Sequence, residues 1–127
     1  MSVIGIGTDI VKVPRIKRLL KKRGNKFAER ILHSNEFEIF KKHSSAANYL
    51  AKRFAAKEAL SKALGTGIAK GISFEEIEVI NNEDGKPFLV LHGAALDISN
   101  QLGVEKLFIS LSDEKKYAIA YVILEGE

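Results

Sequence analysis

The segment Tyr49–Leu64 places a carboxylate and a lysine one helical turn apart, on a helix that should bury apolar surface. At about 100° per residue, one side of this helix forms an apolar stripe, made by Ala47, Leu50, Ala51 and Phe54. Glu58 falls within that stripe, and Lys62 follows one turn later on the same side. A buried carboxylate needs a partner or a metal ion, so Glu58 and Lys62 are candidates for chemistry. The simpler alternative is a surface pair at i,i+4, with the stripe ending at Phe54.

A second carboxylate, Asp9, ends the run Gly5-Ile6-Gly7-Thr8-Asp9 at the point where a predicted strand gives way to a loop. Glycines in a strand allow close approach of another chain segment or a ligand. Alone, such an Asp is most often a turn former or a helix cap. Paired with Glu58, it gives the minimum set for a hard divalent cation that keeps water and takes phosphate oxygens as further ligands, which is typical of Mg²⁺.

The helix ends in Gly65-Thr66-Gly67, which does not continue as a Walker loop. Its backbone amides and the Thr66 hydroxyl could hold a phosphate, with charge supplied from the helix by Arg53, Lys57 and Lys62. The alternative is a helix stop followed by a turn. The three histidines, His33, His43 and His92, have no metal-ligand spacing and are expected at the surface or in structural roles.

Positive charge is concentrated in residues 12–30, which hold nine basic residues and one acid for a net charge of +8 and leave −4 for the rest of the chain. Charge this local points to an acidic partner, although a solvated helix face is the alternative. The exposed positions of the predicted helix include Arg15, Arg18 and Lys22.

The elements that must position these residues fall into two groups. The first half predicts a strand at Val3–Val11, a helix from Val13 that ends before Gly24, short helices at Phe27–Leu32 and Phe37–Lys42, and the long helix from Ser45 to Leu64. Asn35 and Glu38 are expected to cap the second short helix. The second half predicts a hairpin of Ile77–Ile80 and Phe88–Leu91, a helix at Ala94–Leu102, and strands at Lys106–Leu111 and Tyr117–Leu124. This order indicates an α+β fold.

The composition of the chain limits its domain organisation, its chemistry and its location. A chain of 127 residues with 46% hydrophobic and 28% charged residues is expected to form one globular domain, residues 1–127. The absence of Cys excludes disulfides and thiolate chemistry within the chain. No apolar run reaches the length of a membrane span and no leader is evident, so a cytoplasmic protein is expected.

Assembled in order, the motifs resemble those of the holo-[acyl-carrier-protein] synthases, the short 4′-phosphopantetheinyl transferases of bacterial fatty acid biosynthesis. The likeness runs from Ile4 to about Glu125 and is carried by four motifs: Gly5–Ile10, Arg53–Gly67, Gly85-Lys86-Pro87 and Ser110-Leu111-Ser112. It implies a fold of antiparallel strands packed with a long central helix. The implied reaction moves phosphopantetheine from coenzyme A to a serine of an apo acyl carrier protein and releases adenosine 3′,5′-bisphosphate.

The resemblance also assigns roles. It implies Asp9 and Glu58 as the magnesium ligands, with Lys62 at the pyrophosphate, and a homotrimer with active sites between subunits. The nucleotide is implied to lie against Arg53, Lys62, Gly65, Thr66, Gly67, Lys86, Pro87 and Ser112. The basic helix would meet the acidic carrier protein through Arg15, Arg18 and Lys22. Many relatives have His where this chain has Asp113, so no site role carries over to Asp113.

Two other functions remain open from the sequence. The same chemistry could serve a different carrier protein. A basic α+β module that binds nucleic acid is the alternative from another class, but the aromatic residues do not gather in the basic segment as a stacking platform requires.

Overall fold

The computed structural model describes residues 1–69 and 71–127. Its strands form two separate antiparallel sheets, a three-stranded one in the order β1-β5-β4 and a β2–β3 hairpin. Their bounds are β1 Ser2–Lys12, β2 Ile77–Asn81, β3 Pro87–Leu91, β4 Val104–Asp113 and β5 Tyr117–Gly126. The α+β class predicted from the sequence is therefore confirmed, and all three strands of the larger sheet run longer than predicted.

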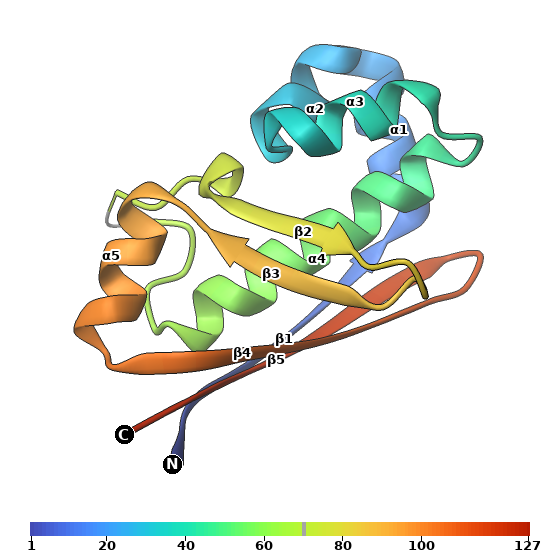
Figure 1. Ribbon diagram of the computed structural model, residues 1–127. Coiled ribbons are helices and arrows are strands. Elements are labelled where there is room, and N and C mark those ends of the chain that lie inside the picture. Colours follow the sequence, from blue (N-terminus) through green and yellow to red (C-terminus); the bar gives the residue numbers. More distant parts are fainter. Residues whose placement is uncertain (70) are drawn as a thin grey trace.

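The long helix α4 (Ala46–Ala63) packs along β1 and β5 of the three-stranded sheet, and the β2–β3 hairpin lies on another side of it (Figure 1). Helices α1 (Val13–Arg23), α2 (Asn25–Ile31) and α3 (Ser34–Lys42) gather around its N-terminal half, and α5 (Gly93–Gln101) joins the hairpin to β4. Both chain termini lie together at the same end of the three-stranded sheet (Figure 1).

Burial around α4 differs from the single stripe that the sequence predicted. Eleven of its residues are buried, and they lie on several sides of the helix, because the sheet, the hairpin and α1 to α3 surround it. Glu58 and Phe54 are only half-buried, whereas Lys57, one residue from Glu58, is fully buried. The expectation that Lys57 supplies charge to a phosphate is therefore wrong.

Lys57 instead forms a buried ion pair with Glu36 of α3, at 2.6 Å between Nζ and Oε1. The ammonium also donates to the carbonyls of Ile31 at 2.7 Å and Phe74 at 3.1 Å. Glu36 in turn accepts from the backbone amide of Val79 in β2 at 2.8 Å. The hydrogen-bond partners of the Lys57 ammonium and of the Glu36 carboxylate therefore lie inside the protein, as buried charges require.

The start of α3 also differs from the prediction. The cap is made by His33 and Glu36, and not by Asn35 and Glu38. The amide of His33 donates to Glu36 at 2.8 Å, and the amide of Asn35 donates to His33 Nδ1 at 3.1 Å. With this cap the helix begins at Ser34, earlier than its apolar pattern indicates.

Among the described residues, none of the helices combines the length and the apolar character needed to cross a membrane.

The ion pair gives the first testable prediction. Replacement of Lys57 by Met should lower the free energy of unfolding by about 3–5 kcal/mol, because Glu36 is left as a buried charge without a cation. Adding Glu36→Gln to that variant should recover part of the loss. Urea denaturation at fixed protein concentration measures both.

Lys52→Met is the matched control, since Lys52 is partly exposed and only approaches Asp113 at 3.8 Å. It should change stability by less than about 1 kcal/mol. Equal losses for the Lys57 and Lys52 variants would contradict a special role for the buried pair.

Candidate functional site

Asp9, Glu58 and Lys62 lie together where β1 crosses α4. The ammonium of Lys62 is 3.1 Å from Asp9 Oδ1 and donates to the carbonyl of Thr8 at 3.0 Å. Lys62 follows Asp9 by 53 residues and Thr8 by 54 residues in the sequence. The packing of β1 on α4 brings them together. The Glu58–Lys62 surface pair considered for the sequence is absent among the ion pairs of the described residues, because Lys62 turns to Asp9.

Two glycines make this close approach possible. A Cβ at Gly7 would clash with the carbonyl oxygen of Ala59, and a Cβ at Gly5 would clash with that of Ala63. Any larger residue at either position would force the strand away from the helix. Asp9 is the next residue on the same face of β1, so its carboxylate is delivered directly to the surface of α4.

A cavity of about 770 Å³ opens beside the two carboxylates. Asp9 and Glu58 line it from β1 and α4, and Arg15 and Arg18 line it from α1. The cavity therefore has an acidic wall and a basic wall. An anionic ligand can be held by the arginines while a cation is held by the carboxylates.

Burial, and then the negative charge of Asp9, raise the pKa of Glu58, while the positive charge of Lys62 opposes the shift. The two carboxylates are therefore close enough to repel each other. A divalent cation between them would remove this repulsion, and oxygen ligands in an open, wet cavity suit Mg²⁺. Asp9 and Glu58 are consequently the residues that fit a magnesium ion.

The Gly65-Thr66-Gly67 segment closes α4. Gly65 and Gly67 have φ angles of +82° and +64°, which favour glycine. The amides of Thr66 and Gly67 both donate to the carbonyl of Ser61 at 3.1 Å, and the Thr66 hydroxyl donates to the Gly67 carbonyl at 2.7 Å. These donors are engaged within the chain, so a phosphate held here would have to replace those hydrogen bonds.

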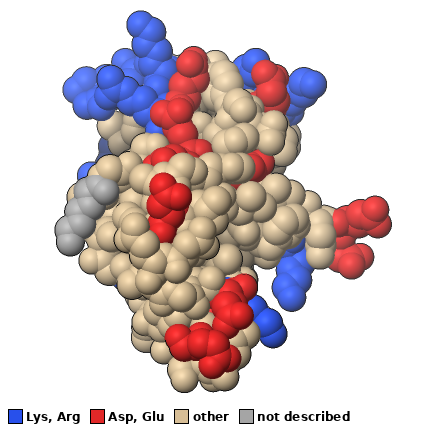
Figure 2. All heavy atoms as spheres, turned by 60° about the vertical axis from the view of Figure 1, so that its left-hand side comes forward, with Lys and Arg blue, Asp and Glu red and all other residues tan. Residues whose placement is uncertain are grey.

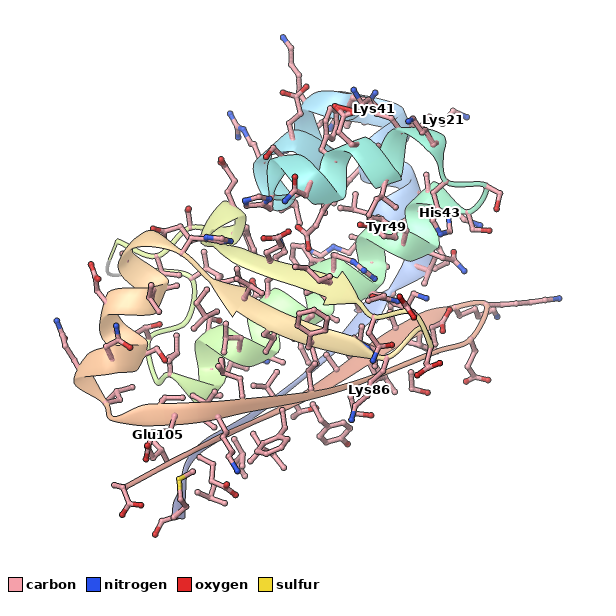
Figure 3. The ribbon with its side chains drawn as sticks, in the orientation of Figure 1. Lys21, Lys41, His43, Tyr49, Lys86 and Glu105 are labelled. Atoms are coloured by element: carbon pink, nitrogen blue, oxygen red, sulfur yellow. The ribbon has the colours of Figure 1, made fainter. Side chains whose placement is uncertain are left out.

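Arg53 lies on a different side of α4 from Glu58. Its guanidinium donates to Asn81 Oδ1 at 2.8 Å and stacks over the ring of Tyr49 at 4.2 Å. Both residues line a second cavity of about 420 Å³, next to β2. Within residues 1–69 and 71–127, Arg53 Nε and the Tyr49 hydroxyl are buried without a hydrogen-bond partner. Figure 3 shows Tyr49 and Lys86, the latter exposed at the β2–β3 turn beside Pro87.

Ser112 belongs to neither cavity. It lies opposite Ile119 of β5, which in turn lies opposite Ile10 of β1, so the three residues share one row of the sheet. This row is on the outer face, whereas Asp9 lies on the face that meets α4. The predicted site residues thus form two groups within one chain. Asp9 and Glu58 lie together at the first cavity, whereas Arg53, Lys86, Pro87 and Ser112 lie away from it, and only Arg53 of these lines the second cavity.

The basic residues of α1 are exposed, as predicted for Arg15, Arg18 and Lys22. In Figure 2 the largest group of Lys and Arg side chains on the face shown lies at the top, at the end formed by α1 to α3. Asp113, which the sequence left without a site role, is 3.8 Å from the ammonium of Lys52.

One cluster was missed by sequence reasoning. His33 and His92 were expected to be surface or structural residues, yet both lie beside the buried Glu78. No fixed spacing could reveal this cluster, because its three members come from three elements that only tertiary packing brings together.

Residues 5–122 match the family model of the 4′-phosphopantetheinyl transferase superfamily. The chain belongs to this superfamily. It is 50% identical over 126 residues to the holo-[acyl-carrier-protein] synthase of Vibrio atlanticus strain LGP32, covering 99% of this chain and 100% of that protein. The corresponding enzyme of Escherichia coli O9:H4 strain HS is 48% identical with the same coverage.

Solved structures of the superfamily share the fold. A holo-[acyl-carrier-protein] synthase from Neisseria meningitidis superimposes with a TM-score of 0.91 at 45% identity, covering 98% of this chain and 99% of that one. A Bacillus anthracis synthase, described as a complex with CoA (3′,5′-ADP), gives a TM-score of 0.83 at 41% identity, covering 98% of both chains.

Proposed function

We propose that this chain is a holo-[acyl-carrier-protein] synthase that transfers 4′-phosphopantetheine from coenzyme A to a serine of an apo acyl carrier protein. The observation that carries the proposal is the cavity in which Asp9 and Glu58 face the arginines of α1, with Lys62 beside Asp9. The full-length relatives named holo-[acyl-carrier-protein] synthase support the same reaction. Fatty acid biosynthesis in the cytoplasm is the setting that the resemblance implies.

The reaction forms a bond between the serine oxygen and the β-phosphorus of coenzyme A and breaks the bond from that phosphorus to the bridging oxygen. Adenosine 3′,5′-bisphosphate leaves with the bond electrons, and the serine loses its proton. Such phosphoryl transfers need mainly positioning and charge neutralisation. Magnesium, when bound, would hold pyrophosphate oxygens and neutralise their charge.

The residues of the chain divide this work. Asp9 and Glu58 would supply the carboxylate oxygens for Mg²⁺. The Lys62 side chain is 51% exposed, so its ammonium can reach the pyrophosphate while the Thr8 carbonyl keeps it oriented. Arg15 and Arg18, on the opposite wall, would face the acidic carrier protein that brings the serine.

The nucleotide end of coenzyme A would use the second group of residues, around Arg53, Lys86, Pro87 and Ser112, together with the Gly65-Thr66-Gly67 segment. Arg53 lines the second cavity, so its guanidinium can meet a ligand there. Since Ser112 lies on the outer face of the sheet and Asp9 on the face that meets α4, a single coenzyme A would meet both only between two subunits.

The outer face of the three-stranded sheet supports such an assembly. It carries large apolar side chains that are at least two-fifths exposed, namely Val3, Ile6, Ile10, Phe108, Tyr121 and Ile123. A patch of this kind marks an interaction surface. We propose that it is the interface of a homotrimer, which places Ser112 at a neighbouring subunit. A monomer in light scattering would contradict this assembly.

Mass spectrometry of apo carrier protein after incubation with the chain, coenzyme A and Mg²⁺ tests the function directly. The wild type should convert the carrier to its phosphopantetheinylated form. Asp9→Ala and Glu58→Ala should abolish conversion at ordinary Mg²⁺ concentrations, because each removes a metal ligand. Glu58→Ala should remain folded, because it removes a half-buried carboxylate whose charge is disfavoured. Full activity of both variants in EDTA would contradict the metal assignment.

Lys62→Ala should lower kcat more than it raises KM for coenzyme A. A loss of about 10²-fold or more, roughly 3 kcal/mol, is expected when one preorganised donor to a developing charge is removed. Lys41→Ala, at an exposed lysine of α3 that pairs with Glu38, is the control and should keep normal kinetics. Near-normal kinetics for Lys62→Ala would contradict a role at the pyrophosphate and would mean that Lys62 serves only to form its hydrogen bonds to Thr8 and Asp9.

The basic helix gives a further prediction. Reversal of Arg15 and Lys22 to Glu should weaken the interaction with the carrier protein and leave the affinity for coenzyme A nearly unchanged. The wild-type kcat/KM for the carrier should fall as salt rises, and the double variant should lose most of this dependence, because its charges are no longer complementary. If kcat/KM depends equally on salt in the wild type and in the double variant, the basic side of the helix is only a solvated face. Tight, salt-sensitive binding to arbitrary nucleic acid would favour the alternative function.

A further inference from the structure

Two histidines and a buried glutamate converge from three elements away from the Asp9–Glu58 cavity. His33 is the residue before α3, Glu78 lies in β2, and His92 lies between β3 and α5. In Figure 1 the β2–β3 hairpin lies beneath α2 and α3, which is why residues so distant in sequence can meet. One ligand atom from each of the three lies within 4.8 Å of the others.

The distances from Glu78 to the two histidines are close to those between ligands of a metal centre. His92 Nε2 is 2.9 Å from Glu78 Oε1, and His33 Nδ1 is 3.7 Å from Glu78 Oε2. Ligands of a tetrahedral ion with bonds of about 2.0–2.1 Å are about 3.3 Å apart. The two observed separations bracket this value. One nitrogen of each ring lies within 4.8 Å of the other. The rings are stacked with centroids 4.9 Å apart and planes at 20°, so they must turn for both nitrogens to face one ion.

Glu78 is held ready as an anionic ligand. Its side chain is 5% exposed, and Asn35 Nδ2 donates to its Oε2 at 3.0 Å. His92 Nε2 lies 2.9 Å from Oε1 of the same carboxylate, so both carboxylate oxygens of Glu78 have a polar partner. Hydrogen bonds to a ligating carboxylate of this kind are a regular feature of metal centres.

The histidines leave the centre accessible. The side chain of His92 is 42% exposed and that of His33 is 23% exposed, so an ion can enter from solvent and keep water in its fourth position. Three protein ligands with one open position are typical of zinc sites that are not closed structural ones.

We infer that His33, Glu78 and His92 form a binding site for a divalent transition-metal ion of the zinc class. Imidazole nitrogens suit Zn²⁺ and its neighbours, whereas Mg²⁺ selects carboxylate, carbonyl and water oxygens. This site is thus separate in both place and chemistry from the magnesium site at Asp9 and Glu58. The inference does not depend on the proposed transferase function.

Binding requires one exchange at His33. In the metal-free protein, Nδ1 of His33 accepts a hydrogen bond from the backbone amide of Asn35 at 3.1 Å, which places the ring proton on Nε2. An ion bound through Nδ1 takes the place of that amide. The Asn35 amide is exposed, so water can satisfy it, and the cost to the cap of α3 is small.

The competing interpretation is a cluster that only fixes local structure. The hydrogen bond from Asn35 to Glu78 joins α3 to β2, and that from His92 to Glu78 joins the end of β3 to β2, without any ion. Both interpretations predict some loss of stability when a histidine is removed. Only the metal site predicts a specific ion with a defined stoichiometry.

The experiment is a calorimetric titration of the untagged full chain with Zn²⁺, in excess Mg²⁺ to occupy the Asp9–Glu58 site. One Zn²⁺ should bind per chain. Removing a partner of a metal ligand typically lowers affinity about 10- to 100-fold, so Asn35→Ala should weaken binding by at least about 10-fold. His92→Ala and His33→Ala remove ligands themselves and should each weaken binding by more than about 100-fold.

His43→Ala is the matched control, because His43 is the remaining histidine of the chain and its ring packs at a tilt against Tyr49, outside the cluster. It should bind Zn²⁺ as the wild type does. Zn²⁺ should also raise the thermal midpoint of the wild type and of His43→Ala, and leave that of His92→Ala unchanged, because an ion that binds only the native state stabilises it. His92 is partly exposed and its side chain caps no helix, so His92→Ala should fold.

Four results would overturn the inference: no saturable binding by the wild type, equal affinity in His92→Ala, loss of binding in His43→Ala, or loss of binding in the Asp9→Ala, Glu58→Ala double variant. The last result would mean that Zn²⁺ binds at Asp9 and Glu58, whereas retention of binding there would separate this site from the proposed magnesium site.

Discussion

The buried ion pair between Lys57 and Glu36 is the constraint on which the arrangement of the helices depends. Its ammonium and carboxylate together hold the end of α2, the start of α3, the segment before β2 and β2 itself. Two charges removed from water are stable only with every hydrogen bond in place, so this network tolerates few alternative packings. It also fixes the rotation of α4 about its axis. Glu58 is the next residue, about 100° around the helix, so anchoring Lys57 on one side directs Glu58 toward the cavity shared with Asp9.

The approach of β1 to α4 supplies the other half of the site. Gly5 and Gly7 remove the side chains that would hold the strand away from the carbonyls of Ala59 and Ala63. Asp9 then reaches Lys62, and two like-charged carboxylates meet in one cavity, which costs free energy in the metal-free protein. Burial is the larger cause of the raised pKa of Glu58, and the negative charge of Asp9 adds to it. Packing that serves only stability would avoid such repulsion, so the arrangement makes sense as a place for a cation and an anionic substrate.

Much of this fold and part of the site could be predicted from the sequence, because turn residues and local patterns mark the elements and the Gly-X-Gly-Thr-Asp run marks a close approach. The failures share a cause. From the sequence, Lys57 is predicted to be a free cation and Asn35 to be the cap of α3. His33 and His92 give no sign of lying together. In each case the true partners lie elsewhere in the chain, and only tertiary packing brings them close. Helix α4 is surrounded on several sides, so the periodicity of its apolar residues does not show which face of the helix carries the candidate site. The pairing of Asp9 with Glu58 could be anticipated because two carboxylates have few structural uses on apolar surfaces.

The division of the proposed site into two groups has a physical origin in the size of the chain. Because α4 is enclosed by the sheet, the hairpin and α1 to α3, the interior is filled by the core, and the cavities lie at its margins. A substrate as long as coenzyme A would need a groove that runs from the carboxylates to a second basic region. Under the proposed assembly, the apolar outer face of the sheet provides that groove between subunits, because covering Ile6, Ile10 and Tyr121 also brings Ser112 against a neighbour. The same surface would then both stabilise the oligomer and complete the binding site, so loss of assembly and loss of coenzyme A affinity are expected to occur together.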